Sequence, residues 1–139
     1  MKIVVTSHGE LCEGILSSYQ MIAGDISQFI SVKLDDKGIS DFSSRLTTVL
    51  DEQTMKNEVV IVLSDIMGGT PYNETFRYML ANPNKVYLMA GLNLSMLIQA
   101  ATIINEPNID EAINSILEAG QASISIAPIT ENSSEDLDF

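Results

Sequence analysis

The stretch Lys2-Ile3-Val4-Val5-Thr6-Ser7-His8-Gly9 decides the fold that we expect for this chain of 139 residues. Its β-branched apolar residues predict a buried strand, and the change to Ser-His-Gly marks the end of that strand. His8 is the only histidine in the sequence. It therefore lies where a strand gives way to a loop, which is where open α/β sheets bind ligands. The simpler interpretation is a histidine that only fills a turn, and a second stretch is needed to choose.

That second stretch begins with Val59-Val60-Ile61-Val62-Leu63, an uninterrupted apolar run typical of a central parallel strand buried on both faces. The run ends in Ser64-Asp65 and continues as Ile66-Met67-Gly68-Gly69-Thr70-Pro71. We expect Thr70 to cap the next helix and Pro71 to lie in its first turn.

Strands and helices alternate along the rest of the chain. Apolar residues recur at helical spacing over residues 11–22, 39–50, 71–80, 94–104 and 109–117, and Gly120 is expected to end the last helix. Two further strands are expected over residues 29–34 and 86–90. This order implies an open, mostly parallel, doubly wound sheet with helices on both faces.

Parallel strands share one direction, so His8 and Asp65 should lie at the same edge of the sheet. If the first and third strands are neighbours, as in the flavodoxin-like order, the two side chains meet at the switch point. They would then form one site.

The C-terminal part of the sequence predicts contact with a second chain. Residues 122–126 alternate strictly between apolar residues (Ala122, Ile124, Ile126) and serine, as in a half-buried edge strand that can run antiparallel to its neighbour. An uncovered edge invites pairing with another chain. The helix over residues 94–104 is apolar nearly all round, which places it inside the fold or in a subunit interface. We therefore expect a homodimer.

Composition limits the function further. The net charge of −12 argues against nucleic acid and against anionic membrane surfaces as partners. A single cysteine, Cys12, suits a reducing cytoplasm and, on the apolar face of a helix, core packing. We expect no signal peptide, because strand residues follow Lys2 at once, and no apolar run reaches the ~20 residues that span a bilayer. We expect one domain over residues 1–127 and an acidic, disordered tail over 128–139, in a cytoplasmic protein that can dock on a membrane complex.

His8 beside Asp65 suggests a nucleophile. A carboxylate that accepts a hydrogen bond from one ring nitrogen fixes the tautomer and leaves the other nitrogen its lone pair. Gly9 leaves room for an approaching group, and the backbone N–H groups of Gly68 and Gly69 can point inward. Thr70 adds a hydroxyl donor, and the start of its helix is a ready anion site. Together these features indicate a phosphoryl group as the ligand, whereas singly each is also explained by a loop cap or a tight turn.

Several other kinds of site are not supported. The sequence has no G-x-x-x-x-G-K-[ST] loop and no G-x-G-x-x-G fingerprint after its first strand. No lysine or arginine lies in either site stretch, as a nucleoside triphosphate site with Mg²⁺ would need. A response-regulator receiver domain would need an acidic pair where Thr6-Ser7-His8 stands. One histidine and one cysteine make no zinc set without recruited carboxylates. We expect neither a metal nor a cofactor.

The residues also resemble a known family. Ser7-His8-Gly9 after an N-terminal strand, with the pattern D-x-x-G-G-[ST]-P-x-N over residues 65–73, resembles the IIA component of the mannose-family sugar phosphotransferase system. The resemblance covers residues 1–127. It implies that His8 is the phosphorylated histidine, Asp65 its orienting carboxylate, and Thr70 a hydroxyl near the phosphoryl group.

The resemblance also implies partners. IIA proteins of this family take phosphate from the carrier HPr and pass it to a IIB component, which serves the membrane IIC/IID permease. The family further implies a homodimer with exchanged C-terminal strands, and the IIB component of this chain would be a separate protein. Two alternatives stay open. One is a non-catalytic regulatory or anion-binding domain, and the other is the phosphotransfer subunit of a dihydroxyacetone kinase, although the Gly-Gly-Thr-Pro block favours the sugar system.

Overall fold

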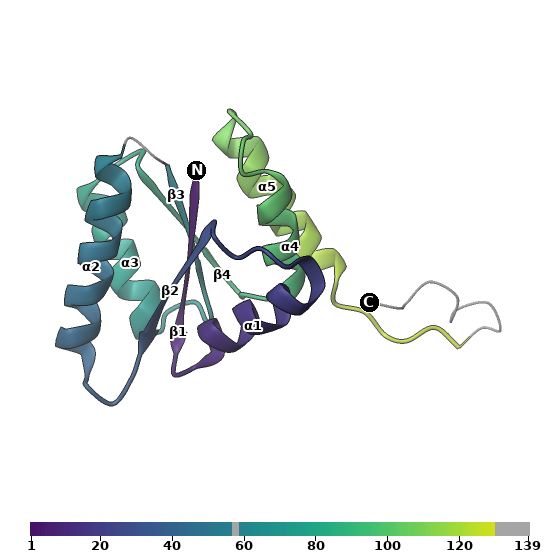
Figure 1. Ribbon diagram of the computed structural model, residues 1–139, viewed down its shortest axis with the longest axis horizontal. Coiled ribbons are helices and arrows are strands. Elements are labelled where there is room, and N and C mark those ends of the chain that lie inside the picture. The colour runs from purple at the N-terminus through teal and green to yellow at the C-terminus, as the bar shows by residue number, and fades with distance from the viewer. Residues whose placement is uncertain (57–58, 130–139) are drawn as a thin grey trace.

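The computed structural model describes residues 1–56 and 59–129. Its strands and helices follow one another in the order that the sequence predicts. The elements in chain order are β1 (Lys2–His8), α1 (Leu11–Ala23), β2 (Phe29–Leu34), α2 (Ile39–Met55), β3 (Val60–Ser64), α3 (Thr70–Ala81), β4 (Val86–Ala90), α4 (Leu94–Thr102) and α5 (Ile109–Ala122). In this described part of the chain the four strands form one parallel sheet in the order β2-β1-β3-β4 (Figure 1). The predicted doubly wound fold is confirmed, with β1 and β3 as neighbours.

Helices cover both faces of the sheet. In Figure 1, α2 and α3 lie on one side of the strands, and α1, α4 and α5 lie on the other. Alternate residues of β3 explain this arrangement, because Ile61 and Leu63 belong to the apolar cluster under α1, α4 and α5. Val60 and Val62 belong to the cluster under α2 and α3. All four side chains are fully buried, as a continuous apolar strand in a two-sided sheet should be.

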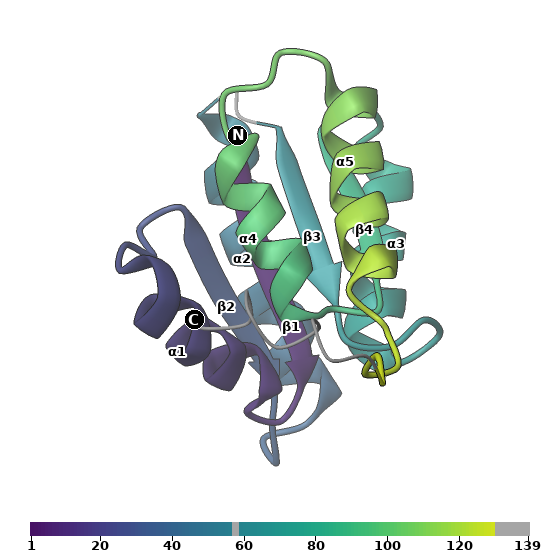
Figure 2. The same ribbon diagram turned by 90° about the vertical axis from the view of Figure 1, so that its right-hand side faces the viewer.

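The apolar helix α4 is covered by the fold itself. It lies between α1 and α5 and over the sheet, as Figure 2 shows. Met96, Leu97 and Ala100 are buried in the cluster on this face. Its composition therefore does not by itself require a second subunit. No helix within residues 1–56 and 59–129 combines the length and apolar character that a membrane span requires.

The prediction that Gly120 ends the last helix is wrong, because α5 continues through it to Ala122. A Cβ at this glycine would lie 2.6 Å from Cγ of Met96, so Gly120 allows α4 and α5 to approach closely. The side chain of Asn93, which caps α4, also donates to the carbonyl of Gly120 over 3.3 Å. Close packing of two helices, and not a helix stop, accounts for this glycine.

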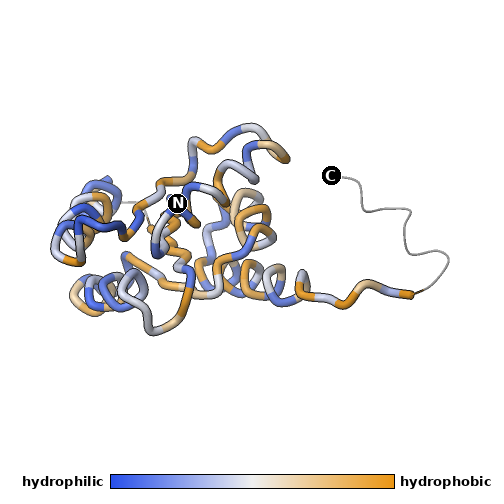
Figure 3. The backbone as a smooth tube through the Cα atoms, turned by 90° about the horizontal axis from the view of Figure 1, so that it is seen from below, coloured by the Kyte–Doolittle hydropathy of each residue, from blue (hydrophilic) through white to orange (hydrophobic). Residues whose placement is uncertain are grey.

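Residues 122–126 do not form a strand in the described single chain. Ala122 is the last residue of α5, and residues 124–129 have no regular structure. The side chains of Ile124 and Ile126 are 80% and 94% exposed. This segment extends away from the helices, and Figure 3 shows its apolar residues outside the body of the protein. Pairing with a second chain stays a prediction, and the predicted tail beyond residue 129 lies outside the described residues.

Candidate active site

His8 and Asp65 meet at the carboxyl edge of the sheet. His8 is the last residue of β1, and Asp65 directly follows β3. The backbone N–H of His8 donates to Oδ2 of Asp65 over 2.9 Å, and ring atom Nδ1 lies 2.8 Å from the same oxygen. A carboxylate only accepts hydrogen bonds, so in the neutral imidazole Nδ1 carries the proton and Nε2 has the lone pair. The predicted meeting of the two side chains is confirmed.

Exposure differs between the two partners. The side chain of His8 is 50% exposed, whereas that of Asp65 is 11% exposed. The ring is therefore anchored on its Nδ1 side by a largely buried group. Nε2 is the ring nitrogen that is left for chemistry with an incoming molecule.

Hydrogen bonds hold Asp65 in its charged form. Burial by itself would raise the pKa of this carboxyl group, but the bonds from the backbone and ring of His8, and from the backbone of Ile66, outweigh burial and lower the pKa below its ordinary value of 3.8. The N–H of Ile66 donates to Oδ1 over 2.9 Å, so both carboxylate oxygens are engaged. Asp65 therefore stays ionised at neutral pH.

We predict that Asp65→Asn lowers the free energy of unfolding by about 1.5–3 kcal/mol at neutral pH, the usual contribution of hydrogen bonds to a charged group. Because the pKa of Asp65 is lower in the folded protein than in the unfolded chain, its stabilisation is complete above the ordinary value of 3.8 and is lost as the pH falls through the folded value. Urea unfolding from pH 5 downward should show the two proteins converging. Asp36→Asn, in an exposed turn, is the control. If both variants differed from the unchanged protein by the same pH-dependent free energy of unfolding, the stabilising role of Asp65 would be contradicted.

Ser7 fixes the loop after β1, a role that the sequence did not reveal. Its buried hydroxyl accepts from the N–H of Cys12 over 2.8 Å and donates to the carbonyl of Gly9 over 3.0 Å. Gly9 has a φ of +57°, and its N–H donates to the carbonyl of Leu34 over 2.7 Å. The only sequence signal for this role is a hydroxyl residue just before a glycine and a helix start.

Cys12 belongs to the core, as predicted. It is fully buried in the cluster under α1, α4 and α5. Burial raises the pKa of its thiol, which keeps the group protonated and poorly nucleophilic. His8 is therefore the better nucleophile in this region.

Gly68 and Gly69 form the wall beside the histidine ring. The N–H of Gly69 bonds to the carbonyl of Ile66 over 3.4 Å, and Gly68 has a φ of +85°, which favours glycine in such a turn. A Cβ at Gly69 would lie 2.7 Å from Cε1 and 3.4 Å from Nε2 of His8. The absence of a side chain at Gly69 thus lets the ring edge that bears Nε2 lie against the backbone.

Helix α3 begins at this wall. The prediction that Thr70 caps the helix is wrong, because Gly69 occupies the N-cap position and no side chain caps the helix. Thr70 is already the first helical residue, and Pro71 lies in the first turn as predicted. Backbone N–H groups at the start of a helix lack intrahelical acceptors and carry partial positive charge. The end of α3 nearest Nε2 is thus suited to an anion, and the Thr70 hydroxyl lies at the same end.

The nearest part of β2 offers no unpaired cation. Lys33 is the register partner of Ser7, and its Nζ lies 3.4 Å from Glu13 and 3.6 Å from Glu10. The charge of Lys33 is therefore engaged by these two carboxylates. Among the described residues, no three His, Cys, Asp or Glu side chains come together in a way that would hold a metal ion.

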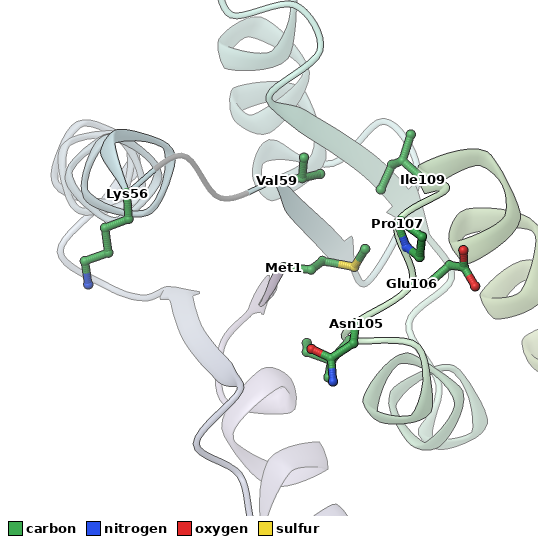
Figure 4. Close-up of a pocket in the computed structure, with 8 residues that line it drawn as sticks. Met1, Lys56, Val59, Asn105, Glu106, Pro107 and Ile109 are labelled. Carbon is green, nitrogen blue, oxygen red and sulfur yellow. The ribbon is translucent and has the colours of Figure 1, made fainter.

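A cavity of about 500 Å³ opens at the opposite end of the sheet, beside the amino ends of β1 and β3 (Figure 4). The charged ends of Lys56 and Glu106 point away from one another there. None of the site residues predicted from the sequence lines it. Its lining residues are Met1, Lys56, Val59, Ile104, Asn105, Glu106, Pro107 and Ile109.

Residues 2–117 match the family described as PTS system fructose IIA component. The fructose-specific EIIA component of Bacillus subtilis (strain 168) is 24% identical over 127 residues, which are 91% of this chain and 86% of that protein.

Two solved structures are similar over nearly their whole length. The mannose/sorbose-specific IIA subunit from Enterococcus faecalis is 34% identical, with a TM-score of 0.77 over 94% of this chain and 96% of that one. The phosphotransferase system component EIIA from Streptococcus agalactiae is 26% identical, with a TM-score of 0.81 over 90% of this chain and 95% of that one. With the match over residues 2–117, these similarities show that the chain belongs to the mannose family of IIA components of the sugar phosphotransferase system.

Proposed function

We propose that this protein is a phosphohistidine carrier that accepts a phosphoryl group on Nε2 of His8 from phosphorylated HPr and passes it to a separate IIB component. The observation that carries the proposal is the 2.8 Å contact between Nδ1 of His8 and Asp65, beside the start of α3. Nδ1 is engaged by Asp65, and within residues 1–56 and 59–129 Nε2 has no hydrogen-bond partner. Family membership supports phosphate transfer within a sugar phosphotransferase system as its context.

The transfer itself needs few groups. The lone pair of Nε2 attacks phosphorus, the bond from phosphorus to the donor imidazole breaks, and its electron pair returns to that imidazole. The Nδ1 proton stays between His8 and Asp65, whose charge stabilises the ring as it becomes positive. The N–H groups at the start of α3 and the Thr70 hydroxyl stabilise the phosphoryl oxygens. Transfer to IIB is the same step in reverse, so donor and acceptor can exchange the group without a metal.

Partners follow from this chemistry and from the family. HPr and IIB must each bring a histidine or similar nucleophile to the exposed edge of the His8 ring. A IIB that serves a IIC/IID permease would take this protein to the cytoplasmic surface of a membrane complex. Gly9, which follows His8 directly, has a positive φ and no atom within 4 Å of a Cβ added there, so it leaves room for an approaching partner. The relatives are named for fructose and for mannose or sorbose, so they do not agree on one sugar.

The direct test is transfer from one labelled protein to another. Purified HPr that carries radioactive phosphate on its histidine should pass the label to this protein, and addition of a cognate IIB should remove it again. The labelled bond should be lost in acid, as expected of a phosphoramidate. A regulatory or anion-binding domain would take up no covalent label, and that result would refute the proposal.

We also propose a homodimer in which residues 122–126 of each chain add to the sheet of the other. β4 is at an edge of the sheet, and α5 ends beside the carboxyl end of β4, where Ala90, Gly91 and Gly120 line one small pocket. The following segment carries Ile124, Ile126 and Ile129 almost fully exposed. An added strand would cover this edge and bury one apolar face. Residues 1–127 would then act as one domain, with 128–139 as a tail.

We predict that replacing both Ile124 and Ile126 with lysine converts the dimer to monomers, because charged groups cannot occupy a buried strand face without a large desolvation cost. Replacing Ser123 and Ser125 with lysine, on the alternate face, is the matched control and should leave the dimer intact. Sedimentation velocity measures the outcome. A double isoleucine variant that sediments as a stable dimer would show that this strand does not hold the subunits together.

A further inference from the structure

Asn73 makes a contact that the mechanism above does not use. It lies in the first turns of α3, and its side-chain Nδ2 donates to the carbonyl of Gly68 over 3.0 Å. Its backbone N–H donates to the carbonyl of Gly69 over 2.8 Å. One residue therefore holds two successive carbonyl groups in the wall beside His8. In residues 1–56 and 59–129, Asn73 is the only hydrogen-bond donor to Gly68 O.

The carbonyl of Gly68 and the N–H of Gly69 belong to the same planar peptide group. In a trans peptide they point in opposite directions, so holding the carbonyl also fixes the direction of the N–H. Two consecutive glycines have wide backbone freedom, and the long 3.4 Å bond from Gly69 to Ile66 restrains them only weakly. Asn73 supplies the shorter restraint on this peptide.

The position of that peptide matters to His8. Gly69 lies so close to the ring that a Cβ there would be 2.7 Å from Cε1. Any rotation of the Gly68–Gly69 peptide would move both this wall and the N–H groups that follow it at the start of α3. Those N–H groups are the ones proposed to stabilise the phosphoryl oxygens.

We infer that Asn73 is a positioning residue for phosphoryl transfer, which holds the Gly68–Gly69 peptide so that the start of α3 faces Nε2 of His8. The inference rests on the proposed function as a phosphohistidine carrier. Asn73 does not touch the phosphoryl group in this role. It acts through the two glycines.

The structure offers a matched control at the other end of the same helix. Asn82 donates from Nδ2 to the carbonyl of Tyr78 over 3.0 Å, which is the same kind of bond at the same length. Asn73 is exposed and Asn82 is partly exposed, so water competes for both bonds and each contributes little to stability. Alanine is a better helix former than asparagine, so Asn73→Ala should keep α3 intact.

The test compares the unchanged protein with Asn73→Ala and Asn82→Ala. The rate of label transfer from phosphorylated HPr is measured over a range of HPr concentrations, to separate the maximal rate from the half-saturating concentration, and urea midpoints are measured in parallel. Asn73→Ala should lower the maximal rate about tenfold to a hundredfold, as misplacement of a reacting group does, with the half-saturating concentration nearly unchanged. Asn82→Ala should keep the maximal rate within about twofold, and the two urea midpoints should be similar.

The outcomes separate the inference from the proposed function. If the unchanged protein takes no label, the proposed function fails and the inference fails with it. If the unchanged protein is labelled and Asn73→Ala has the same maximal rate as Asn82→Ala, the carrier function stands and the inference is overturned. If Asn73→Ala raises only the half-saturating concentration of HPr and leaves the maximal rate unchanged, the inference is also overturned, because Asn73 would then serve partner binding.

Discussion

His8→Ala is expected to lose phosphate acceptance from phosphorylated HPr, by at least about a thousandfold and below detection in a labelling experiment. His8 is the only histidine in the chain, so no second imidazole can take its place. The fold should survive, because the ring is half exposed at the end of a strand. Asp65 would still accept the backbone N–H at position 8 and the N–H of Ile66, so the carboxylate is not left unpaired.

Cys12→Ala is the control for this variant, because the thiol is the other soft nucleophile near the site. It is fully buried, and burial raises its pKa, so its removal should leave labelling unchanged. Circular dichroism and urea unfolding should show both variants folded. Labelling that persists in folded His8→Ala would remove the phosphohistidine from the account.

Gly69→Ala should lower the rate of phosphate acceptance by about a hundredfold while the protein stays folded. The φ of Gly69 is −78°, which alanine adopts without strain, so the effect comes from the added methyl group alone. That methyl group would lie 2.7 Å from Cε1 of His8 and 3.0 Å from Cγ2 of Ile66. The half-exposed ring can swing away to relieve the contact, but it then gives up its hydrogen bond to Asp65.

Gly14→Ala is the matched glycine variant. Gly14 lies within α1, and no atom lies within 4 Å of a Cβ added there. The change should leave the transfer rate unchanged and stabilise the protein slightly, because alanine favours the helix. Stopped-flow transfer or time-resolved labelling measures both variants. Equal rates for Gly69→Ala and Gly14→Ala would show that the ring does not depend on the close approach of Gly69.

The arrangement of the site was predictable because it depends on strand order. The continuous apolar runs that end at His8 and Asp65 indicate buried parallel strands, and such strands bring their carboxyl ends to one edge. The sequence also placed Gly68 and Gly69 beside the histidine. It could not assign Ser7, because a buried hydroxyl that bonds two loop backbone groups looks like any other serine before a turn.

The errors have particular physical causes. Gly120 was expected to end a helix, but the chain needs glycine there because Met96 packs against it from another helix. Thr70 was expected to cap α3, but Gly69 takes the cap position in an extended conformation and Thr70 starts the helix. The predicted strand over residues 122–126 is a different case, because it needs a partner strand that the sheet of the same chain does not supply in the described residues; it stays a prediction about a second chain. Local patterns do not report contacts between distant segments or chains.

The central claim is that Nε2 of His8 carries the phosphoryl group while Nδ1 keeps its proton on Asp65. Nitrogen and phosphorus NMR of protein with isotopically labelled histidine, recorded before and after reaction with phosphorylated HPr, tests this most directly. The account predicts one new phosphorus–nitrogen coupling, to Nε2 of the single histidine, and a retained Nδ1–H. Coupling to Nδ1, or a phosphorus signal with the properties of an acyl phosphate on Asp65, would contradict it.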